Sequence, residues 1–577
     1  MQNLNIKIKK NEEAFLGIVK DILKTKKDST SSIEKILRKN PGENSILSKG
    51  AVIKAYSLLK NELNLSKSEE QLFYKKIRMK NVRTISGVTP ITVLTKPFPC
   101  PGKCIFCPND VRMPKSYLSE EPGAQRAEAN RFDPYLQTHN RLAALKNIGH
   151  PIEKVELIIL GGTWSSYPKQ YQIWFVKRCF DAMNDFYNKN TDLIKPKISQ
   201  PYNEKNLNQK NNKTYNEIVS KALKIQEGLQ ERATWKDLFK SHTLNESGVI
   251  RCVGLVIETR PDEINKEEII NLRRLGATKV QIGIQSLSDR VLELNKRGHD
   301  IKKTSEAIRL LREAGFKIQG HWMPNLYGSS PQKDIIDYKK MFKNISYKPD
   351  ELKIYPCSLL YTAELMNYYK KGLWKPYNEK ELLKVLQFVL KTTPRYCRIT
   401  RMIRDIPSTD IVIGNKKTNF RQIVESSIKH KVQEIRSREI KNSNVKIEKL
   451  KIKVTSYKTS NSTEKFIEYI TENDKIAGFL RLSLPKEKTK HFIRELTRSA
   501  IIREIHVYGQ SLEIGDEKKG KAQHIGLGKN LIYIAIEISK KNKYEKLSVI
   551  SSVGTREYYR KRGFIDGKLY QYTSLIS

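Results

Sequence analysis

Three cysteines in one short segment give the clearest indication of a metal site in this sequence. Cys100, Cys104 and Cys107 are separated by three residues and then by two. Three thiolates on one loop can bind three irons of a cubane 4Fe–4S cluster and leave the fourth iron without a protein ligand. An external molecule can bind that open iron, and S-adenosylmethionine does so in radical chemistry. The spacing therefore predicts a metal site on these three thiols.

A zinc knuckle is the alternative for the same cysteines. Such a site normally needs a fourth Cys or His at similar short range. No Cys or His follows within thirty residues, and the next ones are His139, His150 and Cys179. The spacing therefore favours the iron–sulfur cluster.

A second motif lies near the C-terminus. Gly526 and Gly528 open a segment that continues as an apolar helix over residues 531–538. Backbone N–H groups at a glycine-rich helix start bind anions, and this one suits the pyrophosphate of coenzyme A. A strand over 547–550 and the segment 557–564 follow in the order expected of an acetyltransferase-type domain. Tyr558 and Tyr559 are then candidates to protonate a leaving thiolate, with packing as core aromatics as the alternative.

Residues between these motifs alternate between short apolar runs and amphipathic stretches. We expect strands at 155–160, 253–257, 280–284 and 352–355, and a helix at 301–314. This alternation predicts a parallel sheet of βα units, closed as a barrel or as part of one. Gly161 and Gly162, Glu258 with Arg260, and Gln285 each follow one of these strands, at the edge where such folds bind ligands. A turn for the glycines and a surface ion pair for Glu258 and Arg260 are the alternatives.

The pattern along the chain separates four regions. We expect a basic helical N-terminal region (1–80), a barrel (81–395), a basic connector (396–445) and a second α/β domain (446–577). The polar, asparagine-rich stretch 184–216 is interpreted as a loop insertion without chemistry.

Charge and composition limit the class of protein. The chain carries 107 Lys and Arg against 62 Asp and Glu, a formal net charge of +45. Such a surplus favours a polyanionic partner, although a lysine-rich genome also contributes. Residues 1–80 hold 18 basic and 9 acidic side chains, so we expect this region to dock a phosphate backbone. Seven cysteines, only three of them clustered, do not form a disulfide scaffold and fit a reducing compartment. Because no apolar run is long enough to span a bilayer, we expect a soluble, cytoplasmic protein.

Taken together, these motifs resemble those of one family, the catalytic subunit of Elongator and its single-chain archaeal and bacterial relatives. Members join a radical S-adenosylmethionine domain to a GNAT acetyltransferase domain. The resemblance runs from about residue 80 to the C-terminus and is weakest before it. It is dense in the segments 131–138, 149–156, 161–164, 258–262, 295–299, 314–317, 323–325, 350–356, 404–407, 503–509 and 556–560.

The resemblance implies a tRNA-modifying enzyme that forms 5-carboxymethyluridine at the wobble uridine. A 5′-deoxyadenosyl radical would take a hydrogen from the methyl group of acetyl-CoA, and the resulting carbon would bond to C5 of the base. It further implies tRNA as the partner and no membrane, and it allows a homodimer. Accessory subunits are not implied by the sequence. Cofactors would be a 4Fe–4S cluster, S-adenosylmethionine and acetyl-CoA as co-substrate.

Matching motifs also imply the site residues. Those for S-adenosylmethionine are Gly161, Gly162, Glu258 and Gln285. Those for acetyl-CoA come from both domains: Lys154, Glu504, Ile505, His506, Val507, Ala522, Gln523, His524, Gly526, Gly528 and Tyr559.

The chain departs from the family in the connector. Many relatives have zinc-binding cysteines there, whereas Val432, Glu434 and Ser437 occupy the matching positions here. We therefore expect no zinc, because Cys397 alone cannot make a site.

Two other classes of function stay open. A protein lysine acetyltransferase would explain the second domain but not the cysteine loop. A radical enzyme that acts on a small molecule, like the porphyrinogen-oxidising relatives, would explain the cysteine loop. It would not explain the glycine-rich start of the C-terminal helix.

Overall fold

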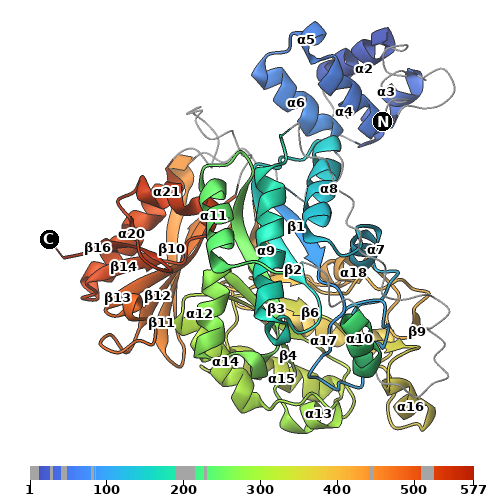
Figure 1. Cartoon of the computed structure of the whole chain (residues 1–577), viewed down its shortest axis with the longest axis vertical. Coiled ribbons are helices and arrows are strands. Elements are labelled where there is room, and N and C mark those ends of the chain that lie inside the picture. Colours follow the sequence, from blue (N-terminus) through green and yellow to red (C-terminus); the bar gives the residue numbers. More distant parts are fainter. Residues whose placement is uncertain are drawn as a thin grey trace.

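The structure is a computed structural model that describes residues 12–25, 30–40, 48–78, 84, 86–188, 215–225, 231–440, 447–508 and 526–576. Three parts follow one another along the chain: a small helical module, a curved parallel sheet wrapped by helices, and a second sheet. Figure 1 shows the second sheet packed beside the first and the helical module projecting next to α8.

Seven strands form the first sheet, in the order β1-β2-β3-β4-β5-β6-β8, and every neighbouring pair is parallel. Because β1 and β8 are edge strands, the sheet is a half-barrel rather than a closed barrel. The strands are β1 (Thr89–Leu94), β2 (Lys154–Leu160), β3 (Arg251–Thr259), β4 (Lys279–Gln285), β5 (Lys317–Trp322), β6 (Glu351–Ile354) and β8 (Arg398–Arg401).

Helices cover the outer face of the half-barrel. They are α8 (Pro134–Asn147), α9 (Lys169–Asn184), α11 (Trp235–Glu246), α12 (Lys266–Arg274), α14 (Ile301–Glu313), α15 (Pro331–Lys343) and α17 (Glu379–Thr392). Shorter elements lie around the rim: α7 (Pro122–Ala129), α10 (Tyr215–Ile225), α13 (Asp289–Leu294), α16 (Leu365–Lys370), α18 (Phe420–Ser426), α19 (Ile435–Arg438), and the strands β7 (Leu359–Leu360) and β9 (Ile411–Ile413).

The two faces of the half-barrel differ in polarity. In β2, Val155, Leu157 and Ile159 are buried against the helices in the main core. Their neighbours Lys154 and Glu156 lie on the opposite face, since successive side chains of a strand alternate. An interior with charged side chains is costly unless those groups are paired or bind something. The interior of the half-barrel is therefore where ligands are to be sought.

The sequence-based strands agree with the structure. The strands expected at 155–160, 253–257, 280–284 and 352–355 correspond to β2, β3, β4 and β6, and the helix expected at 301–314 corresponds to α14. The first sheet also reaches beyond residue 395, because β8 pairs with β6. The segment expected to be a connector therefore contributes an edge strand to the half-barrel.

The second sheet has the order β10-β11-β12-β13-β14-β16-β15. Only β13 and β14 are parallel, and all other neighbours are antiparallel. The strands are β10 (Lys451–Lys458), β11 (Ser462–Ile470), β12 (Ile476–Pro485), β13 (Ser499–Val507), β14 (Lys546–Val549), β15 (Ile565–Asp566) and β16 (Gln571–Ser574), with the helices α20 (Leu527–Lys541) and α21 (Arg556–Arg560). This is an α/β domain with the order of elements expected for an acetyltransferase.

Buried ion pairs join the second sheet to the half-barrel. Arg503 of β13 binds both carboxylate oxygens of Asp350, at 2.6 and 2.7 Å, and its Nε lies 2.9 Å from Glu464. All three side chains are at most 1% exposed. The rings of Tyr396 and Tyr457 stack across the same interface at 3.9 Å. The two sheets are thus held in a fixed relation, and a pocket between them has fixed walls.

The N-terminal helices form a module with its own apolar core. They are α2 (Glu12–Lys24), α3 (Thr30–Lys39), α4 (Lys49–Leu58), α5 (Lys60–Leu63) and α6 (Lys67–Ile77). Phe15, Tyr56 and Phe73 are buried among aliphatic side chains in it. The described residues of the N-terminal region are thus mainly helical, as expected from the sequence. Among the helices that the structure describes, none combines the length and the apolar character needed to cross a membrane.

Candidate functional site

The cysteine loop lies at the carboxyl ends of the barrel strands. It follows β1, and its three thiols are almost buried, at 7–9% exposure. Cys100 Sγ lies 3.5 Å from Thr163 Oγ1, just beyond β2, and Cys107 Sγ lies 3.3 Å from Ser116 Oγ. The loop is thereby fixed against the strand ends, with its thiols directed inward.

Two arginines supply positive charge to the thiols. Arg297 Nη1 lies 3.2 Å and Arg260 Nη1 lies 3.9 Å from Cys104 Sγ. The hydrogen bond with Cys107 and these guanidinium groups hold the pKa of the Cys104 thiol well below its usual range. A thiol with a lowered pKa in a cationic setting is readily present as the thiolate that binds iron, and Cys104 is such a thiol. Arg260 is 5% exposed, which excludes the surface ion pair considered from the sequence.

These thiols fit a cluster better than a single ion. In the described part of the chain, no three Cys, His, Asp or Glu side chains gather around one ion position. A cubane cluster does not require such a gathering, because each thiolate binds a different iron. Gly102 leaves room for one of the two arginines. A Cβ at this position would lie 2.2 Å from Arg260 Nη1, so the glycine lets this guanidinium group approach the cysteine loop.

Asn216 corrects one interpretation of the sequence. The stretch 184–216 was expected to be an insertion without chemistry, and residues 189–214 lie outside the described part. At its end, however, the Asn216 side chain accepts from Cys100 N at 3.0 Å and donates to Cys100 O at 2.9 Å. This residue therefore fixes the backbone at the first cysteine.

The residues expected to bind S-adenosylmethionine lie at the same end of the half-barrel. Gly161 and Gly162 follow β2, Glu258 is near the end of β3 and Gln285 ends β4. Among the described residues, Glu258 Oε2 and Gln285 Oε1 are buried without a hydrogen-bond partner, and burial raises the pKa of Glu258. Gln285 also has a φ of +65°. Buried polar atoms without partners in the protein are suited to a ligand.

The glycine pair has a packing role as well. A Cβ at Gly161 would lie 2.2 Å from Thr95 Oγ1, and the Gly162 N–H already donates to Tyr167 Oη at 2.7 Å. That amide is therefore not available to a ligand.

A pocket of about 1850 Å³ opens at the opposite, amino-terminal ends of the strands. Its walls come from the half-barrel, the connector and the second domain. The first residues of six barrel strands line it: Lys154, Arg251, Lys279, Lys317, Glu351 and Arg398. β2 alone has seven residues, so Lys154 and the glycines at the cysteine end are about 20 Å apart.

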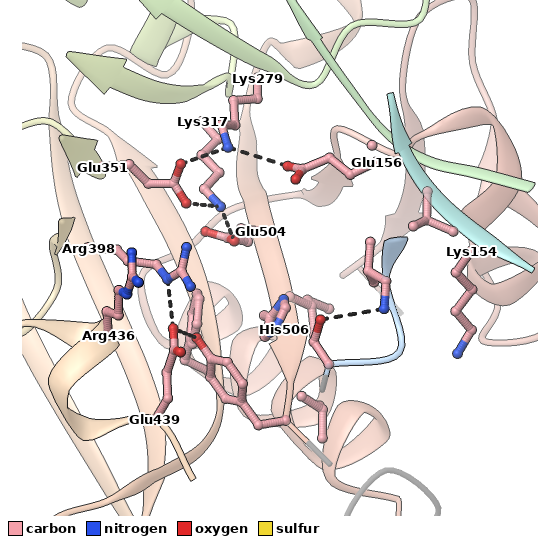
Figure 2. Close-up of a pocket in the computed structure, with 18 of the residues that line it drawn as sticks. Lys154, Glu156, Lys279, Lys317, Glu351, Arg398, Arg436, Glu439, Glu504 and His506 are labelled. Atoms are coloured by element: carbon pink, nitrogen blue, oxygen red, sulfur yellow. Dashed lines mark hydrogen bonds and ion pairs between the residues drawn. The ribbon is translucent and has the colours of Figure 1, made fainter. Parts of the chain in front are cut away.

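Where the pocket meets the interior of the half-barrel, side chains form a charged layer, defined as Glu156, Lys279, Glu351, Lys317 and Glu504 (Figure 2). Lys279 Nζ lies 2.7 Å from Glu351 and 3.3 Å from Glu156. Lys317 Nζ bridges Glu351 at 2.7 Å and Glu504 at 2.5 Å. Glu504 belongs to β13, so this layer links the two domains.

Two cations at the pocket differ from these lysines. Within the described residues, Lys154 and Arg251 make no ion pair, and burial lowers the pKa of each. Gly526, with a φ of +72°, directly precedes α20, and Gly526, Gly528 and Lys529 line the same pocket at the start of this helix. Gly528 must lack a Cβ, because one would lie 2.6 Å from Tyr558 Oη. Unpaired cations and a helix N-terminus make this pocket suitable for a phosphorylated ligand.

The remaining residues expected to bind acetyl-CoA divide into two groups. Ile505, His506, Val507, Tyr558 and Tyr559 line the pocket with Glu504. His506 Nε2 is buried without a partner, and burial lowers the pKa of its ring. Ala522, Gln523 and His524 lie outside the described residues.

The two tyrosines differ in their surroundings. Tyr559 is 7% exposed and packs in the second core with its ring 5.5 Å from Phe564, so burial raises its pKa. Tyr558 stacks against the Arg562 guanidinium at 3.4 Å and lies beside the start of α20. Tyr558 is thus the one of the two phenols nearer to the glycine-rich helix start.

Sequence reasoning missed several groups that the fold brings to these sites. Arg297, Thr163 and Ser116 contact the thiols, and Arg251 lies beside Lys154 in the pocket. The lysines of the charged layer were also missed. Lys279 and Lys317 are each the first residue of an apolar strand. A lysine at the start of each of two neighbouring strands could have indicated a charged cluster at the amino ends of the sheet.

Comparison with known proteins agrees with this geometry. The Radical SAM superfamily model matches residues 211–333, and the Radical_SAM C-terminal domain model matches residues 349–430. The cysteine loop precedes both segments. A half-barrel with three clustered cysteines at the carboxyl ends of its strands, together with these matches, defines a radical SAM protein.

Relatives over most of the length specify the family. The tRNA uridine(34) acetyltransferase of Methanocaldococcus infernus is 36% identical over 518 residues, which cover 86% of this chain and 88% of the relative. Human Elongator complex protein 3 is 30% identical, with 85% and 84% covered. The solved structure of M. infernus Elp3 lacking its N-terminus superposes with a TM-score of 0.66 at 32% identity, covering 85% of this chain and 100% of that one. The chain belongs to the Elongator complex protein 3 family.

Proposed function

We propose that this protein forms 5-carboxymethyluridine at the wobble position of tRNA, with S-adenosylmethionine and acetyl-CoA as co-substrates. The observation that carries the proposal is one half-barrel with two unlike sites at its two ends. Three buried thiols lie at the carboxyl ends of the strands, and a cationic pocket shared with the second domain lies at the amino ends. The relatives named tRNA uridine(34) acetyltransferase support position 34 of tRNA as the target.

At the carboxyl end, Cys100, Cys104 and Cys107 would hold a 4Fe–4S cluster. Together with S-adenosylmethionine, such a cluster supplies a carbon radical able to remove an unactivated hydrogen. Arg260 and Arg297 would offset the negative charge of the thiolates. Glu258 and Gln285 would bind S-adenosylmethionine with their unpartnered oxygens, and Gly161 and Gly162 would let the ligand approach the strand ends.

At the amino end, the pocket would hold acetyl-CoA. Lys154, together with the N–H groups at the start of α20, would bind its phosphates, since charge-assisted hydrogen bonds are the strong ones in phosphate recognition. Residues 504–507 of β13 would bind the rest of the molecule, with Tyr558 placed to donate a proton to the departing thiolate. Residues 522–524 and Tyr559 complete the proposed set.

The two sites share the interior of the half-barrel. Glu156, Lys279 and Glu351 line the pocket and belong to strands whose side chains also form that interior. An acetyl group held there would point along the strands toward the cysteine end, about 20 Å away. In the overall conversion the acetyl methyl would lose one hydrogen atom to the 5′-deoxyadenosyl radical and its carbon would bond to C5 of uracil. The C5 hydrogen would then leave as a proton and one electron would return to the cluster. Water would hydrolyse the thioester and release coenzyme A as the thiol. The second domain is on this account a holder of acetyl-CoA more than an acetylator of amines.

The N-terminal module and the positive charge would serve tRNA binding. The net charge of +45 favours a polyanion, and electrostatic binding of this kind weakens steeply with salt. We propose the region before residue 80 as part of the tRNA-binding surface.

A test separates this function from lysine acetylation. The reconstituted protein is incubated without oxygen with acetyl-CoA and either tRNA or a lysine peptide, and the release of coenzyme A is measured. We expect tRNA to stimulate release and the peptide not to. Efficient peptide acetylation without any effect of tRNA would refute the proposal.

A further inference from the structure

We propose that the interior of the half-barrel contains a uracil-binding subsite in which Lys353 donates a hydrogen bond to the C4 carbonyl oxygen of the target base. The inference rests on the proposed function and adds the residue that would distinguish uridine from cytidine. Neither site already described contains Lys353.

Lys353 lies in the middle of β6 and points into the half-barrel. Its neighbours Leu352 and Ile354 are fully buried in the main core on the outer face, so the alternation of the strand directs Lys353 inward. Its Nζ donates to Gln281 Oε1 at 2.6 Å. His321 Nε2 lies 3.3 Å from the same oxygen. Three adjacent strands, β4, β5 and β6, therefore contribute one side chain each to a single polar cluster.

The pairing of Lys353 differs from that of the other interior lysines. Lys279 and Lys317 each contact two glutamates in the charged layer. Lys353 forms no ion pair with any residue that the structure describes, and its hydrogen bond goes to a neutral amide. An ammonium group has three N–H donors, so two remain for a ligand or water. Glu258 is the carboxylate on which Lys353 acts, since the ammonium opposes the rise in the pKa of Glu258 that burial causes. The two groups form no ion pair, so the ammonium keeps N–H donors for an oxygen-rich ligand.

The cluster of Gln281, His321 and Lys353 lies between the cysteine loop and the pocket. Toward the cysteine end, His321 Nδ1 lies 3.6 Å from Glu258, whose second oxygen has no partner. Toward the pocket, Gln319 on the same face of β5 donates to Glu351 of the charged layer at 2.9 Å. The target base has to meet the acetyl group from the pocket and the radical formed at the cysteine end. It would therefore lie in the interior between them, where this cluster is.

The donors of the cluster match uracil better than cytosine. Uracil presents carbonyl oxygens at C2 and C4, whereas cytosine presents an amino donor at C4. A lysine ammonium can donate to the C4 oxygen but meets a second donor in cytosine, and an unpaired donor is costly in a buried site. Burial, Lys353 and Arg404 together hold the pKa of His321 well below its usual range, so its ring is neutral and adds no second cation. A wobble base can reach this depth because it lies in a single-stranded loop.

The test compares two anticodon stem-loop RNAs that differ only in having uridine or cytidine at the wobble position. Their dissociation constants are measured for the reconstituted wild type, for Lys353→Met and for Lys353→Gln. We expect the wild type to prefer uridine by about 10- to 100-fold, the range for one hydrogen bond to a charged group. Lys353→Met should lose the preference, and Lys353→Gln should reduce it because an amide can pair with either base. Lys391→Met, at an exposed position of α17, is the matched control and should keep the preference.

Affinities for acetyl-CoA and S-adenosylmethionine are measured for the same proteins and should be unchanged. A preference that persists in Lys353→Met, or is absent in the wild type, would overturn the subsite. Weakened acetyl-CoA or S-adenosylmethionine binding with an intact preference for uridine would assign Lys353 to those ligands instead. If the wild type prefers uridine but produces no modified nucleoside, the proposed function fails while the subsite stands.

Discussion

Asp350, at the junction between the two domains, allows a quantitative prediction for the free energy of unfolding. Asp350 accepts from both Nη groups of Arg503 and from the Ile318 N–H, and Arg481 lies 3.5 Å away. Asp350→Asn keeps the shape of the side chain but removes the charge that compensates buried Arg503. Removing one partner of a buried pair typically costs about 3–5 kcal/mol, so we expect a loss of that size in the free energy of unfolding. Because both domains line the pocket, acetyl-CoA affinity should fall as well.

The effect should depend on pH. Burial alone would raise the pKa of Asp350, but Arg503 and Arg481 outweigh it and hold the pKa well below its usual range. A carboxyl with a lowered pKa stabilises the fold above its unfolded pKa of about 3.9, and this contribution disappears as the pH falls toward the folded value. The difference between wild type and Asp350→Asn should therefore be complete at pH 7 and shrink below about pH 4.

Equilibrium urea unfolding at several pH values measures both quantities. Glu379→Gln is the matched control, because Glu379 pairs with Lys417 at the surface with both side chains at least half exposed. This control should change the free energy of unfolding by no more than about 0.5 kcal/mol. A loss below about 1 kcal/mol in Asp350→Asn at pH 7, or a loss that does not change with pH, would refute the reasoning.

Three further predictions concern the two sites. Cys104→Ala should lose bound iron while acetyl-CoA affinity stays unchanged, because the pocket lies at the other end of the half-barrel; a full iron content would contradict the cluster assignment. Gly528→Ala should weaken acetyl-CoA binding by about 10-fold or more in calorimetric titration, since a Cβ would lie 2.6 Å from Tyr558 Oη at the proposed phosphate site. Lys154→Met should weaken acetyl-CoA binding by about 10- to 100-fold and make it less sensitive to salt, and an unchanged affinity would place the phosphates elsewhere.

The sequence predicted the elements whose signals are local. The spacing of Cys100, Cys104 and Cys107 identified the loop, and apolar runs identified four strands of the half-barrel because each run needs only its own residues to be recognised. The Gly526 and Gly528 pattern likewise located the start of α20. That Glu258 and Gln285 lie toward the same end of the half-barrel followed from the rule that parallel strands end at the same edge.

The rest depends on pairings between residues far apart in the chain. Asp350 and Arg503 are separated by 153 residues, and nothing near either one indicates the other. The bridge from Lys317 to Glu504 spans 187 residues and exists only because the second sheet packs on the amino ends of the strands. Asn216 was assigned to an insertion because its neighbours are polar, although its side chain clamps Cys100.

The central claim is that the acetyl carbon of acetyl-CoA becomes bonded to the wobble base of tRNA in a reaction that requires the cysteine loop. It is tested most directly by incubating the reconstituted protein anaerobically with tRNA, S-adenosylmethionine, a reductant and acetyl-CoA labelled with carbon-13 in both acetyl carbons. Mass spectrometry of the tRNA nucleosides should find 5-carboxymethyluridine that retains both labelled carbons, and Cys104→Ala should produce none. Unmodified uridine at the wobble position, or labelled product from Cys104→Ala in equal amount, would contradict the account.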